Sequence, residues 1–148
     1  LSWNFVLATA ICASLLAQLI KVLLNLFIFH RFIAERMWGA GGMPSSHSAT
    51  VCAMVVATGR YCGVNSPIFA IAAVLSIIVM YDAMGVRYET GEQAKVLNRM
   101  FTEWMDQGFE QFQLPHGKKL KEMVGHTPIE VVTGAALGIV LGFAMPMV

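Results

Sequence analysis

Long apolar stretches alternate with shorter polar ones along the chain. Predominantly apolar residues fill 1–32, 46–63, 67–86 and 127–147, and about 20 apolar residues suffice for a helix to cross the hydrocarbon core of a bilayer. Glycine, proline, serine and charged residues, which favour turns and helix ends, separate the stretches. The pattern predicts an all-α integral membrane protein with about four transmembrane helices, in a single domain that covers residues 1–148.

The hydrophilic segment 88–124 has a pattern of its own. Its apolar residues Ala94, Leu97, Phe101 and Trp104 fall at helical spacing, while charged residues occupy the other faces. Such a stripe is typical of an amphipathic helix. We expect this interfacial helix to lie on the bilayer surface or over the bundle.

Composition supports a membrane location. Hydrophobic residues make up 57% of the chain and charged residues only 13%, which is far from the average of soluble proteins. The net charge is +1 and no basic block alternates with aromatic residues, so we expect no nucleic-acid partner. The three cysteines show no spacing typical of a metal site or a disulfide framework, and we interpret them as packing residues.

The basic residues indicate an orientation. With four spans, the loop after the first span and the segment after the third lie on one face and carry most of the Lys and Arg, including the cluster Lys118, Lys119 and Lys121. The positive-inside rule then predicts a multi-pass protein of a bacterial inner or organellar membrane, with this face cytoplasmic. A homo-oligomer is compatible with so small a bundle, although no motif argues for one.

Residues 41–50 form a polar, turn-rich island between apolar stretches. The segment holds two glycines, Pro44, Ser45, Ser46 and His47. One interpretation is an ordinary loop followed by a serine N-cap, with His47 on the surface. The other is an oxyanion site, because a helix N-terminus, two hydroxyls and an imidazole suit a phosphate.

Two apolar spans contain isolated charges. Lys21 shares one helical face with Gln18 and Asn25; it either faces a functional site inside the protein or snorkels to the lipid headgroups. Asp82 and Arg87 are the first charges after the third apolar run. They mark either the membrane interface or an ion pair beside a cavity.

The last span begins with two polar residues that have alternative roles. Thr127 and Glu130 have the spacing of a capping box, with Pro128 at the first helical position. His126 and Glu130 are also four residues apart, so the carboxylate can hold one imidazole nitrogen and leave the other free as base or nucleophile. The two interpretations are compatible.

These motifs together resemble a known superfamily. Residues 44–48 (Pro-Ser-Ser-His-Ser) resemble the Pro-Ser-Gly-His-Ser motif of the type 2 phosphatidic acid phosphatases, and residues 125–131 resemble their last motif, in which an Asp follows a His by four residues. Residues 82–87, with Gly91, Gln93, Ala94, Leu97 and Asn98, look like the divergent bacterial and plant branch. The superfamily also includes the vanadium-dependent haloperoxidases.

The resemblance implies roles for individual residues. His126 would be the nucleophile that takes the phosphoryl group, Glu130 would replace the orienting Asp, and His47 would be the general acid. The two serines beside His47 would bind phosphate oxygens, and Lys21 looks like the family's first-motif Lys.

The chain also departs from the family pattern. No Arg-Pro pair is present, and Leu120 stands where the third-motif Arg is expected. We expect Arg87 to take that role, with Lys119 or Lys121 as alternatives. Ser46 replaces the motif Gly, which changes the backbone freedom of the phosphate site.

These residues predict a membrane-bound lipid-phosphate phosphatase that acts through a phosphohistidine without a metal or other cofactor. The substrate would be a phospholipid or isoprenyl phosphate from the surrounding bilayer. The first alternative is a catalytically inactive protein that binds lipid phosphates or acts as a scaffold. The second is a metal-dependent hydrolase or transporter that uses His47, Asp82, His126 and Glu130.

Overall fold

The computed structural model describes residues 4–29, 42–108, 119–122 and 124–147, and these residues form helices and connecting segments without a strand. The helices are α1 (Phe5–Phe29), α3 (Ser46–Cys62), α4 (Pro67–Met84), α5 (Val86–Asp106) and α6 (Pro128–Ala144). Within the described ranges, Phe5–Phe27 and the helical run Pro67–Asp106 are long and apolar enough to cross a membrane, and Pro128–Ala144 is a shorter apolar helix. The all-helical prediction is confirmed, while the number of spans stays a prediction.

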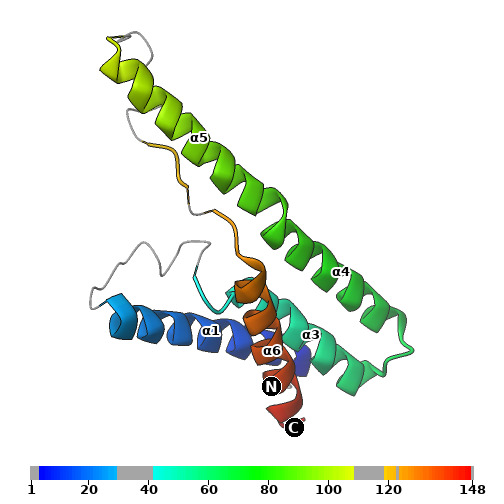
Figure 1. Cartoon of the computed structure of the whole chain (residues 1–148). Helices are drawn as coiled ribbons and strands as arrows, with labels where there is room; N and C mark the ends of the chain where they lie inside the picture. The colour runs from blue at the N-terminus through cyan, green and yellow to red at the C-terminus, as the bar shows by residue number, and fades with distance from the viewer. Residues whose placement is uncertain (1–3, 30–41, 109–118, 123, 148) are drawn as a thin grey trace.

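Helix α3 lies at the centre of the bundle and packs against α1, α4 and α6 (Figure 1). The core consists of small residues, namely Ala13 and Ala17 of α1 and Ala49 and Ala53 of α3. Large apolar side chains such as Leu15 instead point outward. A bundle with small residues inside and large apolar residues outside is suited to a lipid surrounding, where close backbone packing holds helices together.

Three glycines allow α6 to lie against the backbone of α3. A Cβ atom on Gly134 would lie 2.3 Å from the carbonyl oxygen of Ser45, and one on Gly138 would lie 2.2 Å from that of Ala49. A Cβ on Gly142 would lie 2.6 Å from Cβ of Val56. Only glycine permits this approach, so the first turns of α3 and α6, which carry the two histidine motifs, lie side by side.

The opposite end of the bundle is tied by Arg60 of α3. Its guanidinium donates to the carbonyl oxygens of Gly142 and Met145, each at 2.7 Å, and lies 5.5 Å from the ring centroid of Phe5. The described chain ends therefore lie together, at the end of the bundle away from the histidine motifs (Figure 1).

Helix α5 continues the direction of α4 and leaves the bundle (Figure 1). Gly85 separates the two helices, yet its N–H donates to Tyr81 and its carbonyl accepts from Glu89, so helical hydrogen bonding runs across the joint. Among the described helices α5 contacts α4 alone. Of the two expected placements, the one over the bundle is therefore wrong, because the joint at Gly85 does not turn the chain back, while the placement on the bilayer surface stays a prediction.

The inward face of α5 also differs from the predicted stripe. Of the stripe, Ala94 is buried within the protein, but its buried neighbours are Gly91 and Asn98, while Leu97 is 43% exposed. The buried face meets residues 119–122 and 124–126, which run back along α5 to the start of α6 (Figure 1).

Candidate active site

The loop before α3 is fixed by Ser45. Its hydroxyl oxygen accepts from the N–H of Ser48 at 3.3 Å and from the hydroxyl of Ser48 at 3.1 Å, which makes Ser45 the N-cap of α3. Its own N–H donates to the carbonyl oxygen of Glu130 at 3.0 Å. Ser46 is also buried, and its hydroxyl oxygen accepts from Nε2 of Gln18 at 3.4 Å. The loop is thus tied to both α1 and α6.

His126 is held on two sides and almost fully buried. Its Nδ1 lies 3.0 Å from Oε2 of Glu130, and its backbone N–H donates to the carbonyl oxygen of Ala83 in α4 at 3.1 Å. Glu130 Oε2 also accepts from the N–H of Thr127 at 3.1 Å. The two interpretations of Glu130 therefore hold together geometrically, since one carboxylate caps α6 and contacts the imidazole.

The second ring nitrogen of His126 is the unusual atom of the site. Nε2 is buried and has no hydrogen-bond partner among the described residues. A buried polar atom without a partner is rare in native proteins and indicates a missing ligand or a catalytic role. A carboxylate at Nδ1 favours the tautomer in which Nδ1 carries the proton, which leaves a lone pair on Nε2.

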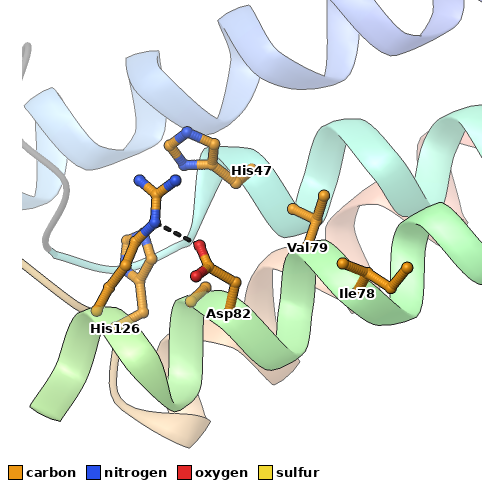
Figure 2. A pocket seen from close by; sticks show the side chains of 7 residues that line it. His47, Ile78, Val79, Asp82 and His126 are labelled. Carbon is orange, nitrogen blue, oxygen red and sulfur yellow. Dashed lines mark hydrogen bonds and ion pairs between the residues drawn. The ribbon is translucent and has the colours of Figure 1, made fainter.

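The two histidines face a common cavity of about 330 Å³. Their ring centroids are 6.2 Å apart, with an angle of 58° between the ring planes. Figure 2 shows His47 from α3 and Asp82 from α4 pointing into the same space, with His126 beside them. Ile78, Val79 and Ala83 of α4 form the apolar part of the wall.

An ion pair lies across the joint between α4 and α5. Nε of Arg87 lies 2.5 Å from Oδ2 of Asp82, and both side chains are partly exposed and line the cavity (Figure 2). Since Asp82 lies in the last turn of α4 and Arg87 in the first turn of α5, the pair spans Gly85. The interpretation of an ion pair beside a cavity agrees with this geometry.

Lys21 turns inward from α1. It is 2% exposed and interacts electrostatically with Glu130. A Cβ on Gly42 would lie 3.6 Å from Cδ of Lys21, so the lysine stem passes close to the loop before α3. The interpretation of a snorkelling lysine is wrong, because the side chain is enclosed by the bundle.

The three cations proposed to replace the missing family arginine differ in whether they line the cavity. Arg87 lines the cavity and acts electrostatically on His47, as does Lys21. Lys119 and Lys121 are exposed and do not line the cavity. Among the described residues, the acidic, His and Cys side chains form no group of three or more that could hold a metal ion, so the four residues of the metal hypothesis do not make such a site.

Sequence reasoning missed some parts of the site. The sequence places Gln18 on the same helical face as Lys21 but indicates no role for it. In the structure its amide donates to the hydroxyl oxygen of Ser46. The carbonyl of Ala83 and the apolar wall of Ile78 and Val79 carry no sequence signal, since a backbone acceptor and an aliphatic side chain look the same in any helix.

The family assignment follows from comparison with known proteins. The sequence profile described as "Divergent PAP2 family" matches residues 2–141, which include both histidine motifs. The chain belongs to the divergent PAP2 family. Its resemblance to the type 2 phosphatidic acid phosphatases is thereby confirmed at the level of family.

One relative in this family adds to the membrane assignment. The uncharacterized membrane protein YuiD of Bacillus subtilis (strain 168) is 38% identical over 144 residues, which cover 93% of this chain and 91% of that protein. No solved structure matches the chain. Its divergent PAP2 membership, the relative's description and the outward-facing large apolar residues support a membrane protein with a phosphatase-related fold.

Proposed function

We propose that this divergent PAP2 protein is a lipid-phosphate phosphatase that works through a phosphohistidine. The observation that carries the proposal is the cavity in which His126, held by Glu130 and with Nε2 unpartnered among the described residues, faces His47 and Arg87. A nucleophile held by an orienting carboxylate, with a second titratable group beside it, is the arrangement of covalent catalysis.

In the first step, Nε2 of His126 attacks phosphorus in line with the bond to the alcohol oxygen. The new N–P bond forms as the P–O bond breaks, and protonated His47 gives its proton to the departing oxygen. In the second step, neutral His47 takes a proton from water as the water oxygen attacks phosphorus and the N–P bond breaks. The products are an alcohol and inorganic phosphate, and both histidines return to their initial states.

Cations and hydrogen-bond donors around the cavity support a phosphate ligand. Arg87 lines the cavity. Lys21, which acts electrostatically on His47, and buried Ser45 and Ser46 at the start of α3 do not line it, but they add positive charge and hydroxyl and amide groups next to His47. Such groups stabilise the equatorial oxygens of a transferring phosphoryl group. Asp82 holds Arg87 in the unliganded site, and a phosphate that binds there competes with Asp82 for the guanidinium.

The apolar wall supports a lipid tail on the substrate. Val79 and Ile78 line the cavity, and Ile78 is 58% exposed on the outer face of α4. Further along the same helix, Leu75, Val74 and Ile71 are also exposed. An acyl or isoprenyl chain that lies along α4 in the bilayer would bring its phosphate to the histidines.

The positive-inside argument orients the site in this proposal. Lys119 and Lys121 belong to the segment that runs beside α5 towards His126 and the start of α6 (Figure 1). We place the end of the bundle that holds the start of α6 on the cytoplasmic side of the membrane.

The decisive experiment is phosphate release from a panel of phospholipid and isoprenyl phosphates by the detergent-purified protein. The wild type should release phosphate, His126→Ala should release none, and Lys95→Ala, which changes an exposed residue of α5, should match the wild type. A chelator should leave the rate unchanged. Equal release by His126→Ala would contradict the histidine nucleophile.

The pH dependence gives a second test. His126 must be unprotonated for attack while His47 must carry a proton, so kcat/KM should be bell-shaped. A flat profile between about pH 5 and pH 9, the range in which histidines titrate, would contradict this division of roles.

An inactive lipid-phosphate binding or scaffold protein remains the second candidate. It is favoured by the engagement of Arg87 with Asp82 and by the absence of the Arg-Pro pair. It predicts that the folded wild type binds a lipid phosphonate, in which a P–C bond replaces the scissile P–O bond, without hydrolysing any phosphate ester in the panel.

A further inference from the structure

The segment that leads to the nucleophile is pinned to α5 by a buried asparagine. We name residues 119–122 and 124–126 the strap. Asn98 is 5% exposed, and its Nδ2 donates to the carbonyl oxygen of Leu120 at 2.9 Å while its Oδ1 accepts from the N–H of Leu120 at 2.9 Å. Nδ2 also lies 2.8 Å from Oε1 of Glu122. The asparagine amide thus pairs with the strap as a neighbouring strand would.

Two glycines keep the strap against α5 between this pin and the cavity. A Cβ on Gly91 would lie 2.5 Å from the carbonyl oxygen of Glu122, and one on Gly125 would lie 2.3 Å from Cα of Tyr88. Neither position has room for a side chain. The strap therefore follows the helix surface closely down to His126, whose N–H bonds to Ala83.

The contacts with the strap give α5 a structural role. The helix leaves the bundle and contacts α4 alone among the described helices (Figure 1). Its buried face, formed by Gly91, Ala94 and Asn98, is turned to the strap. His126 lies before the first residue of α6, so its backbone is held by α6 on one side and by the strap on the other.

We propose that Asn98 is a positioning residue for His126, and that it acts by fixing the register of the strap. Leu120 lies six residues before His126, a reach of up to about 20 Å in extended chain. If the strap slipped by one residue relative to Asn98, its backbone would move by about 3.3 Å along α5. Each strap side chain would then point to the opposite side of the strap. The catalytic part of this inference rests on the proposed function, whereas the positioning itself does not.

The test uses labelling of the histidines, which needs no turnover. Diethyl pyrocarbonate acylates accessible imidazole nitrogens, and mass spectrometry assigns the site. In the wild type, exposed His47 should react fast and buried His126, which is reached only through the cavity, much more slowly. In Asn98→Ala, His126 should react about tenfold faster, as expected when a buried hydrogen-bonding pin is removed, while His47 should react at its wild-type rate.

Two further variants separate positioning from a general loss of packing. Gln93→Ala removes an exposed amide from the same helix and should leave both labelling rates unchanged. Asn98→Asp sets a carboxylate against Glu122 and should expose His126. Adding Glu122→Gln should restore only part of the protection, because the new amide can donate to the introduced carboxylate while the donor to the Leu120 carbonyl oxygen is still missing.

The outcomes are distinct. An unchanged His126 rate in Asn98→Ala overturns the proposal, and so does an equal rise at His126 and His47, which would indicate loosening of the whole bundle. If the wild type also hydrolyses lipid phosphates, Asn98→Ala should lower kcat by on the order of 100-fold with little change in KM, because a displacement of about 1 Å has such an effect. A wild type without turnover would count against the proposed function and leave the labelling result valid.

Discussion

The α3–α6 interface and the α4–α5 arm build the same cavity in opposite ways. At the interface, glycine brings backbone against backbone, and the N-cap of α3 bonds directly to the first turn of α6. On the arm, Asp82 and Arg87 meet as a partly exposed ion pair, and α5 contacts no other described helix than α4. The contrast indicates that the interface fixes the distance between the histidines, whereas the arm supplies the groups that can adjust to a ligand.

The largest effect should come from breaking the interface. Gly138→Val would place a branched side chain where a single Cβ already lies 2.2 Å from the Ala49 carbonyl oxygen. We expect a loss of about 1–3 kcal/mol in stability from overpacking, together with loss of phosphate release. Thermal unfolding in detergent measures the first and the lipid-phosphate assay the second.

Ala136→Val is the matched control, because Ala136 is exposed on the same helix. It should melt and react like the wild type. A Gly138→Val protein with wild-type stability would show that α3 and α6 are not in backbone contact.

The next effect should come from Glu130, which serves both the interface and the chemistry. Glu130→Gln keeps an oxygen that can accept from Thr127 but removes the charge beside His126. We expect kcat to fall by on the order of 10²–10⁴-fold, as for other orienting carboxylates, and the melting temperature to fall as well, because buried Lys21 loses the carboxylate that acts on it. A variant that melts early but keeps its kcat would assign Glu130 to capping alone.

A smaller effect is expected on the arm. Asp82→Asn releases Arg87 from its ion pair, and an exposed pair of this kind contributes only about 0–1 kcal/mol to stability. Stability should therefore hardly change. The apparent affinity for inorganic phosphate as a competitive inhibitor should rise, since Arg87 no longer has to leave a carboxylate. A fall in phosphate affinity would mean that Asp82 itself orients Arg87 for the ligand.

The smallest effect should lie on the outer face of α5. Nζ of Lys95 lies 2.6 Å from Oε1 of Glu92, and this hydrogen bond raises the pKa of the exposed lysine. Lys95→Ala should leave both the melting temperature and phosphate release unchanged within error. A clear loss of activity would show that the exposed face of α5, and not only its buried one, takes part in function.

The sequence was sufficient for the parts of the site that depend on local spacing. His126 and Glu130 are four residues apart at a helix start, and Ser45 precedes α3 as an N-cap, so their contacts follow from helix geometry. The polar island and the isolated charge in the first span indicated His47 and Lys21 as candidates, and the family resemblance gave them roles. The structure places both beside His126 or Glu130.

The parts that sequence reasoning missed depend on contacts between distant segments. The apolar stripe of α5 showed which residues share one face but gave no sign that Asn98 is buried, because its burial depends on pairing with the backbone of Leu120, 22 residues further along the chain. The sequence also did not reveal the direction of α5. A glycine after a helix usually indicates the end of that helix, whereas the hydrogen bonds of Gly85 continue the helical pattern from α4 into α5.

The burial of Lys21 has a consequence for how the protein is made. A lysine in the middle of a spanning helix costs about 2.5–3.5 kcal/mol during insertion, and the carboxylate that acts on it, Glu130, belongs to α6. Lys21 therefore gains this carboxylate only when α6 has been synthesised and has joined the bundle. Assembly of the proposed phosphate site then waits for a helix that leaves the ribosome long after the lysine has done so.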